Sequence, residues 1–175
     1  MRTMANNCYN FINVSGDDLS GVEAFMKECM QVNNTGYGWL PEWMKEDYEK
    51  LDYVHYLFDM EDNGDGSYVC WTKWAPPIEE LIIISRKLAG VTWEMEWEEC
   101  GMGLYGRCVI RDGVVVSLVE LTEDEVNQVK LDEEKDMYVW TKPDGTVETS
   151  ESDSELYNEM LDQKTLSLSV LGQPN

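Results

Sequence analysis

Residues 68–116 constrain the fold most strongly, because both secondary structure and chain reversals are marked along this stretch. The aromatic and β-branched run at residues 68–74 predicts a strand. The Pro76-Pro77 pair after it suits the start of a helix, where a missing amide hydrogen removes no hydrogen bond. A helix over residues 78–88 and a second strand over residues 91–98 follow. This order predicts a mixed α+β fold.

The segments before this stretch supply the remaining elements of a ferredoxin-like fold. We expect a strand at residues 8–14, a helix at residues 19–30 and a strand at residues 53–60, with a hairpin turn at residues 63–66. Strand, helix, strand, strand, helix, strand is the order of the split βαβ sandwich, in which two helices cover one face of an antiparallel sheet. Residues 37–51 are predicted to be an insertion that carries a short helix.

Beyond this core the pattern predicts an extra β-hairpin, formed by residues 104–110 and 114–121. We therefore divide the chain into a ferredoxin-like α+β domain over residues 4–121 and an acidic C-terminal extension over residues 122–175. The extension contains a capping box, a hairpin and a last helix, expected at Thr122, residues 137–149 and residues 154–163.

Three short elements resemble the YubB-type ferredoxin-like domain family, whose members come from phages, plasmids and bacteria. They are MANNCYN at residues 4–10, WTKWAPPI at residues 71–78 and EECGMGLYG at residues 98–106. Three positions depart from the family pattern, namely Asn7, Ala75 and Trp97. The resemblance covers residues 4–116 and implies the fold and an origin in a mobile element. It implies no activity, and "ferredoxin-like" describes chain topology rather than an iron–sulfur cluster.

The net charge of −22, from 35 acidic and 13 basic residues, limits the kinds of partner. Binding to nucleic acid or to an anionic membrane depends on Lys and Arg, so direct binding to either is disfavoured. No run is long and apolar enough to span a bilayer, and the N-terminus lacks the apolar segment of a signal peptide, which predicts a cytoplasmic protein. The resemblance implies that the cell is a bacterial host. The five cysteines form no CxxC pair and His55 is the single histidine, so we expect mostly buried, reduced thiols, no metal and no cofactor.

Two motif matches are interpreted as turns. The run Gly101-x-Gly103-x-x-Gly106 has the letters of the dinucleotide fingerprint, but a strand is predicted after it, whereas the fingerprint requires a helix to hold the pyrophosphate. Residues 59–66 (DMEDNGDG) are similar to a calcium loop, yet the twelfth position from Glu61 is Thr72, where an EF-hand needs a glutamate. Both stretches are predicted to reverse the chain.

The candidate functional surface is acidic. In VTWEMEWE, residues 91–98, the apolar side chains fall on one face of a strand and the acids on the other, about 7 Å apart. Further acids cluster in the extension, which has 14 acidic and 4 basic residues. Two interpretations stay open: a solvated surface, or an imitation of nucleic-acid phosphates. The predicted partner-binding residues are Glu94, Glu96, Glu98, Glu123, Asp124, Glu125, Asp132, Glu133 and Glu134.

We expect a non-enzymatic binding protein of a mobile element that inhibits a basic, nucleic-acid-binding host protein, such as a defence nuclease or CRISPR effector, by charge mimicry or occlusion. Two alternatives stay open. One is a small enzyme that uses His55 or a carboxylate pair in a cleft. The other is a module that self-associates through an exposed sheet edge. The sequence predicts no catalytic residue and leaves the oligomeric state open.

Overall fold

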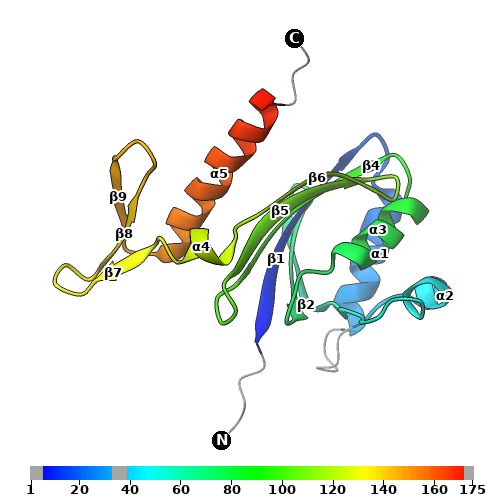
Figure 1. Ribbon diagram of the computed structural model, residues 1–175. Coiled ribbons are helices and arrows are strands. Elements are labelled where there is room, and N and C mark those ends of the chain that lie inside the picture. The colour runs from blue at the N-terminus through cyan, green and yellow to red at the C-terminus, as the bar shows by residue number, and fades with distance from the viewer. Residues whose placement is uncertain (1–5, 33–38, 172–175) are drawn as a thin grey trace, which may run out of the picture. The chain divides into compact units, whose positions relative to one another are not determined.

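The computed structural model describes residues 6–32 and 39–171, so positions 37–38 of the predicted insertion lie outside the described residues (Figure 1). The chain divides into two compact units, Met1–Leu118 and Val119–Asn175. Each unit has its own sheet.

The first unit is built on a six-stranded antiparallel sheet in the order β2-β3-β1-β4-β5-β6. Its first four members have the arrangement of the split βαβ sandwich, and the β5–β6 hairpin extends the sheet beside β4. The predicted fold class is therefore confirmed. The strands are β1 (Asn7–Gly16), β2 (Phe58–Gly64), β3 (Ser67–Lys73), β4 (Val91–Glu99), β5 (Leu104–Arg111) and β6 (Val114–Glu120). The helices are α1 (Ser20–Val32), the 3-10 helix η2 (Glu42–Met44), α2 (Lys45–Tyr48) and α3 (Ile78–Lys87).

Helices α1 and α3 lie on the same side of the sheet, and the core forms between them and the strands (Figure 1). Trp93, Met95 and Trp97 of β4 alternate into this core, as the period of two predicts. The Trp93 ring is fully buried and meets the Phe25 ring of α1 edge-on, with the centroids 6.4 Å apart. The alternate side chains of β4 point to the opposite face of the sheet, which α1 and α3 leave open.

The predicted strand over residues 53–60 is wrong in its first half, because β2 begins only at Phe58. The backbone N–H of His55 donates to a side chain of α3, the Glu80 carboxylate, at 2.6 Å, and the residues around it do not join the sheet ladder. Asp59 then adopts a positive φ of 49°, and the register against β3 shifts after Phe58. The alternation at residues 53–57 therefore belongs to a loop anchored on α3.

The second unit contains a three-stranded antiparallel sheet in the order β7-β8-β9, and helix α5 contacts β8 and β9. Trp140, Leu156, Met160 and Leu161 are buried, so the acidic extension has an apolar core of its own. β7 was not predicted, and the last helix runs to Leu171 rather than ending at residue 163. The elements are α4 (Glu123–Val126), β7 (Lys130–Asp132), β8 (Met137–Thr141), β9 (Val147–Ser150) and α5 (Asp153–Leu171).

Candidate functional site

The open face of the six-stranded sheet brings three of the predicted acids together with aromatic side chains. Glu98 stands opposite Tyr9 of β1, and Glu96 stands opposite Phe11 in the next row. Cross-strand partners share one face of a sheet, so these rows continue onto the neighbouring strands. We define the open sheet face by its side chains: Tyr9, Phe11 and Asn13 of β1; Phe58 and Glu61 of β2; Val69 and Trp71 of β3; Glu94, Glu96 and Glu98 of β4; and Arg107 and Val109 of β5. Tyr105 of β5 stands opposite Glu98 but is buried.

Two of the three β4 carboxylates of this face reach solvent freely. Glu94 and Glu96 are exposed, and Glu98 is half-buried. Arg107 stands opposite Glu96 on β5, but its Nε lies 3.9 Å from the Glu96 Oε1, and the Glu96 side chain keeps 51% of its surface exposed. An ion pair of that length in contact with water contributes little, and its charges remain available to a partner.

Tyr9 links the aromatic and acidic parts of the open sheet face. Its ring packs edge-on against Trp71, with the centroids 5.1 Å apart. Burial raises the pKa of the Tyr9 hydroxyl above its ordinary value, and the carboxylates of Glu98 and Glu61 raise it further. Tyr9 is therefore a neutral hydrogen-bond donor beside acids, an arrangement that suits binding of a cationic surface and supplies no nucleophile.

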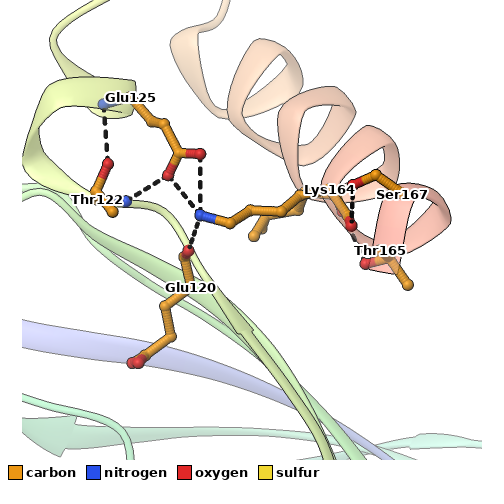
Figure 2. A network of polar contacts seen from close by, with 7 residues as sticks. Glu120, Thr122, Glu125, Lys164, Thr165 and Ser167 are labelled. Atoms are coloured by element: carbon orange, nitrogen blue, oxygen red, sulfur yellow. Dashed lines mark hydrogen bonds and ion pairs between the residues drawn. The ribbon is translucent and has the colours of Figure 1, made fainter. Parts of the chain in front are cut away.

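The remaining predicted acids lie in the second unit, where two of them stabilise the unit itself. Thr122 and Glu125 form the predicted capping box of α4, which is confirmed. Lys164 of α5 donates to both carboxylate oxygens of Glu125, at 2.9 and 2.6 Å, and to the backbone carbonyl of Glu120 at 2.9 Å (Figure 2). Asp132 is paired with Lys135 at 2.9 Å. The predicted acids that stay exposed here are Glu123, Asp124, Glu133 and Glu134.

The ionisation of Glu125 follows from these contacts. Burial opposes the charged form, but the Lys164 ammonium and the hydrogen bonds to Thr122 outweigh it, so that the pKa of Glu125 lies below its ordinary value. The charge of Glu125 is thus coupled to the folding of its own unit, and a partner would have to compete with Lys164 for it.

The glycine motif is a turn, as predicted, since β5 begins at Leu104 directly within it. The buried carboxylate of Glu99 accepts hydrogen bonds from the backbone N–H groups of Gly101 and Met102. The Glu99 carboxyl group therefore already occupies the amides to which a phosphate would bind. Gly106 has a packing role, because a Cβ at this position would lie 2.3 Å from the Trp97 ring.

Residues 59–66, similar in sequence to a calcium loop, form part of β2 and the turn that follows it. The Asp62 carboxylate accepts the Gly64 N–H at 2.8 Å, which is the contact of a polar hairpin turn. Nowhere in residues 6–32 and 39–171 do three His, Cys, Asp or Glu side chains group in a way that could hold a metal ion.

Glu80 is a buried acid that the sequence analysis missed. Its side chain is fully buried on α3, its Oε1 accepts the His55 N–H at 2.6 Å, and the same oxygen lies 3.4 Å from His55 Nδ1. Its Oε2 has no hydrogen-bond partner within the described part of the chain. Glu80 lies four residues before Ile84 on the apolar face of the helix, and this spacing is the signal that could have identified it. The pair holds the loop at residues 53–57 against α3.

The thiols have the environment of core residues. Cys8, Cys29, Cys70 and Cys108 are buried and form no disulfide, and Cys100 is exposed. Burial raises the pKa of Cys8 and of Cys29 to about 12, so neither forms a thiolate at neutral pH. The prediction of mostly buried thiols is confirmed.

Comparison with known proteins gives one match. A family model described as "ferredoxin-like domain in Api92-like protein" matches residues 54–141, which is half of the chain. The match runs from the loop before β2 to the end of β8, so it begins later than the resemblance at residues 4–116 and extends into the second unit. No curated protein and no solved structure matches the chain. Among the helices that the structure describes, none is both long and apolar enough to cross a membrane.

Proposed function

This chain belongs to the family of ferredoxin-like domains in Api92-like proteins, and we propose that it is a non-enzymatic, acidic protein-binding domain encoded by a phage or plasmid. Its partner is a basic, nucleic-acid-binding protein of the bacterial host, such as a defence nuclease or CRISPR effector. The domain acts in the host cytoplasm and inhibits that partner by charge mimicry or occlusion. Kinship with the YubB-type domains and the mobile-element origin are parts of the same proposal.

The open sheet face is the observation that supports this proposal. It combines exposed carboxylates, Glu94 and Glu96, with the aromatic rings of Tyr9, Phe11 and Trp71. Charges of one sign attract a basic partner over distance, and aromatic side chains supply the close contacts that dominate binding energy in protein interfaces. The net charge of −22 adds a long-range attraction that salt weakens.

The experiment compares two variants of equal total charge. The first reverses three acids of the open sheet face, in Glu94→Lys, Glu96→Lys and Glu98→Lys. The second reverses three exposed acids of the helical layer and insertion, in Glu28→Lys, Glu46→Lys and Glu79→Lys. Each set changes the net charge by +6, from −22 to −16, so that any difference between the two reflects position and not total charge.

The partner is first captured from host lysate at ~50 mM salt, released at ~500 mM salt, and identified by mass spectrometry, since screening separates electrostatic from apolar association. The purified partner is then titrated with each variant. We expect the open-face variant to bind at least about tenfold more weakly and to lose inhibition of nucleic-acid binding, while the helical-layer variant keeps both. Equal binding by two variants with unchanged circular dichroism would show that the acids only confer solubility.

Self-association is a second candidate function, favoured by the edge strand β6. Val114, Val116 and Leu118 alternate along this edge and expose 62%, 64% and 44% of their surfaces. An exposed apolar edge strand pairs readily with another chain. A mass by light scattering that rises above 20.2 kDa with concentration, and returns to that value in Val116→Lys, would support this candidate.

A further inference from the structure

A cleft between α1 and the β2–β3 turn has the composition of a site for an organic cation. Its volume is about 550 Å³, within the range of roughly 300–1,000 Å³ that is usual for ligand-binding clefts. It lies on the helical side of the sheet, because Tyr68, which lines it, stands opposite the core residue Ile12. The cleft is therefore distinct from the open sheet face.

The walls of the cleft are of two kinds. Leu19, Met26 and Met30 supply apolar surface along α1, and the carboxylates of Glu23 on α1 and Asp62 near the turn lie close by. Methionine adapts its shape to an aliphatic ligand more easily than branched side chains do. The lining thus suits a ligand with an aliphatic part and a charged end.

The charged groups that line the cleft carry a net negative charge. Three acids, Glu23, Asp62 and Asp65, share the lining with one base, Lys27, which gives a formal charge of −2. In residues 6–32 and 39–171, no ion pair engages Glu23, Asp65 or Lys27. A cation that entered the cleft would therefore meet carboxylates that are not already paired with Lys27.

Tyr68 provides the second, independent indication of a ligand. Only 4% of the residue is exposed, and its hydroxyl forms no hydrogen bond with any residue in the described ranges. The hydroxyl is not one of the buried polar atoms that lack a partner, so it is accessible from the cleft that Tyr68 lines. Burial raises the pKa of Tyr68, and the carboxylates of Asp62 and Glu23 raise it further, so both acids act on the same hydroxyl. The phenol is consequently a neutral polar group in the wall of the cleft, near enough to both acids for their charges to act on it.

The acids surround the cleft without forming a chelating group, because no set of three carboxylate, thiol or imidazole groups among the described residues could hold a metal ion. A planar guanidinium on an alkyl stem fits better, since it pairs with carboxylates through several N–H groups and stacks on aromatic rings. We infer that this cleft binds an arginine side chain of a protein partner, with the stem against Met26 and Met30 and the guanidinium at Glu23, Asp62 and the Tyr68 hydroxyl. The inference rests on the proposed function, because nucleic-acid-binding proteins carry arginine on the surfaces that contact phosphate.

The test titrates the full, ¹⁵N-labelled chain with Nα-acetyl-L-arginine amide and follows the amide resonances. We expect shifts confined to residues 19–30 and 62–68, and none with the uncharged analogue Nα-acetyl-L-citrulline amide. The double variant Glu23→Gln/Asp62→Asn should weaken binding at least about tenfold. It keeps the turn, because an asparagine oxygen still accepts the Gly64 N–H. Tyr68→Phe should weaken binding about threefold, as expected for loss of one hydrogen bond.

The matched control is Glu94→Gln/Glu96→Gln on the open sheet face, which changes the total charge equally and should leave arginine binding unaltered. Equal weakening in both double variants, shifts spread over the whole chain, or equal binding of the citrulline analogue would overturn the inference. Agmatine, which has the guanidinium without peptide groups, should bind no more tightly than the arginine amide. A tenfold preference for agmatine would instead identify a free small molecule as the ligand and overturn the assignment to a partner side chain.

The two proposals fail in different experiments. If the open-face variant loses partner binding but the original chain binds no arginine amide in the cleft, only the inference about the cleft is refuted. If the cleft binds arginine amide but reversing the acids of the open sheet face does not change partner capture, only the proposed function is refuted.

Discussion

Replacing Gly106 with alanine tests whether the GxGxxG motif serves packing or phosphate binding. Gly106 stands opposite Trp97 in the β4–β5 ladder, and the Trp97 ring covers the position that a side chain would occupy. An added Cβ would lie 2.3, 2.7 and 2.9 Å from three atoms of the ring, whereas carbon atoms in ordinary contact are about 3.5–4.0 Å apart. The ring must therefore move by about 1 Å, and Trp97 is only 4% exposed.

The expected loss of stability follows from two opposing effects. Overpacking a well-filled core costs about 1–3 kcal/mol. Alanine in a strand restrains the unfolded chain more than glycine does, which returns about 0.5–1 kcal/mol. We therefore expect Gly106→Ala to lower the free energy of unfolding of the first unit by about 1–2 kcal/mol, a measurable part of the roughly 5–15 kcal/mol that is usual for a domain.

The measurement is hydrogen exchange of the β4 and β5 amides under native conditions, because two units need not unfold in one transition. Trp97→Phe removes the outer atoms of the ring, so Gly106→Ala should cost about 1 kcal/mol less in that background than in the original chain. Unchanged exchange in Gly106→Ala would refute the packing argument. Unchanged exchange accompanied by weakened binding of a dinucleotide would favour the phosphate-binding interpretation instead.

Three further predictions concern groups inside each unit. Glu80→Ala should destabilise the first unit by about 1–3 kcal/mol because the part-buried His55 N–H loses its acceptor, whereas Glu80→Gln keeps an acceptor and should cost less than about 1 kcal/mol in denaturant unfolding. Because the pKa of Glu125 is lowered in the folded protein, its charge stabilises the second unit at pH values above the ordinary pKa of 4.5. This stabilisation is lost as the pH falls through the lowered pKa of the folded state, so Lys164→Met should flatten the dependence of stability on pH in that acidic range. Alkylation of the native chain at neutral pH should modify Cys100 alone, and mass spectrometry showing modified Cys8 or Cys29 would contradict their burial.

The parts of the fold that the sequence predicts correctly are those where local signals agree with each other. On β4, a period of two, large aromatic side chains and flanking glycines all indicate one half-buried strand, and the structure places Trp93, Met95 and Trp97 in the core. The capping box joins residues only three apart, Thr122 and Glu125, so the local sequence is enough to predict it. Agreement of this kind also made the order of the ferredoxin-like elements predictable.

The parts that were mispredicted depend on contacts between distant residues. Residues 53–57 alternate like a strand, but a carboxylate 25 positions away accepts the His55 N–H, and this long-range bond holds the segment outside the sheet. β7 has only three residues, and it is a strand because these residues pair with β8. The role of Glu80 was not predicted for the same reason, because an acid on the apolar face of a helix can be assigned a role only when its hydrogen-bond partner is known.

The same distinction decides how the acids of the candidate surface should be interpreted. Charge counted along the chain suggests that the C-terminal extension is the main acidic binding surface. However, Glu125 and Asp132 are paired with lysines of their own unit. Glu94 and Glu96 belong to a less acidic stretch of sequence, but they stand exposed among aromatic rings on the open sheet face. A binding surface needs charges that are free and fixed in position, because a partner gains little from carboxylates already paired within the domain. Glu94 and Glu96 are the acids of the open sheet face that are exposed, so reversing Glu94, Glu96 and Glu98 should weaken binding more than reversing any three acids of the second unit.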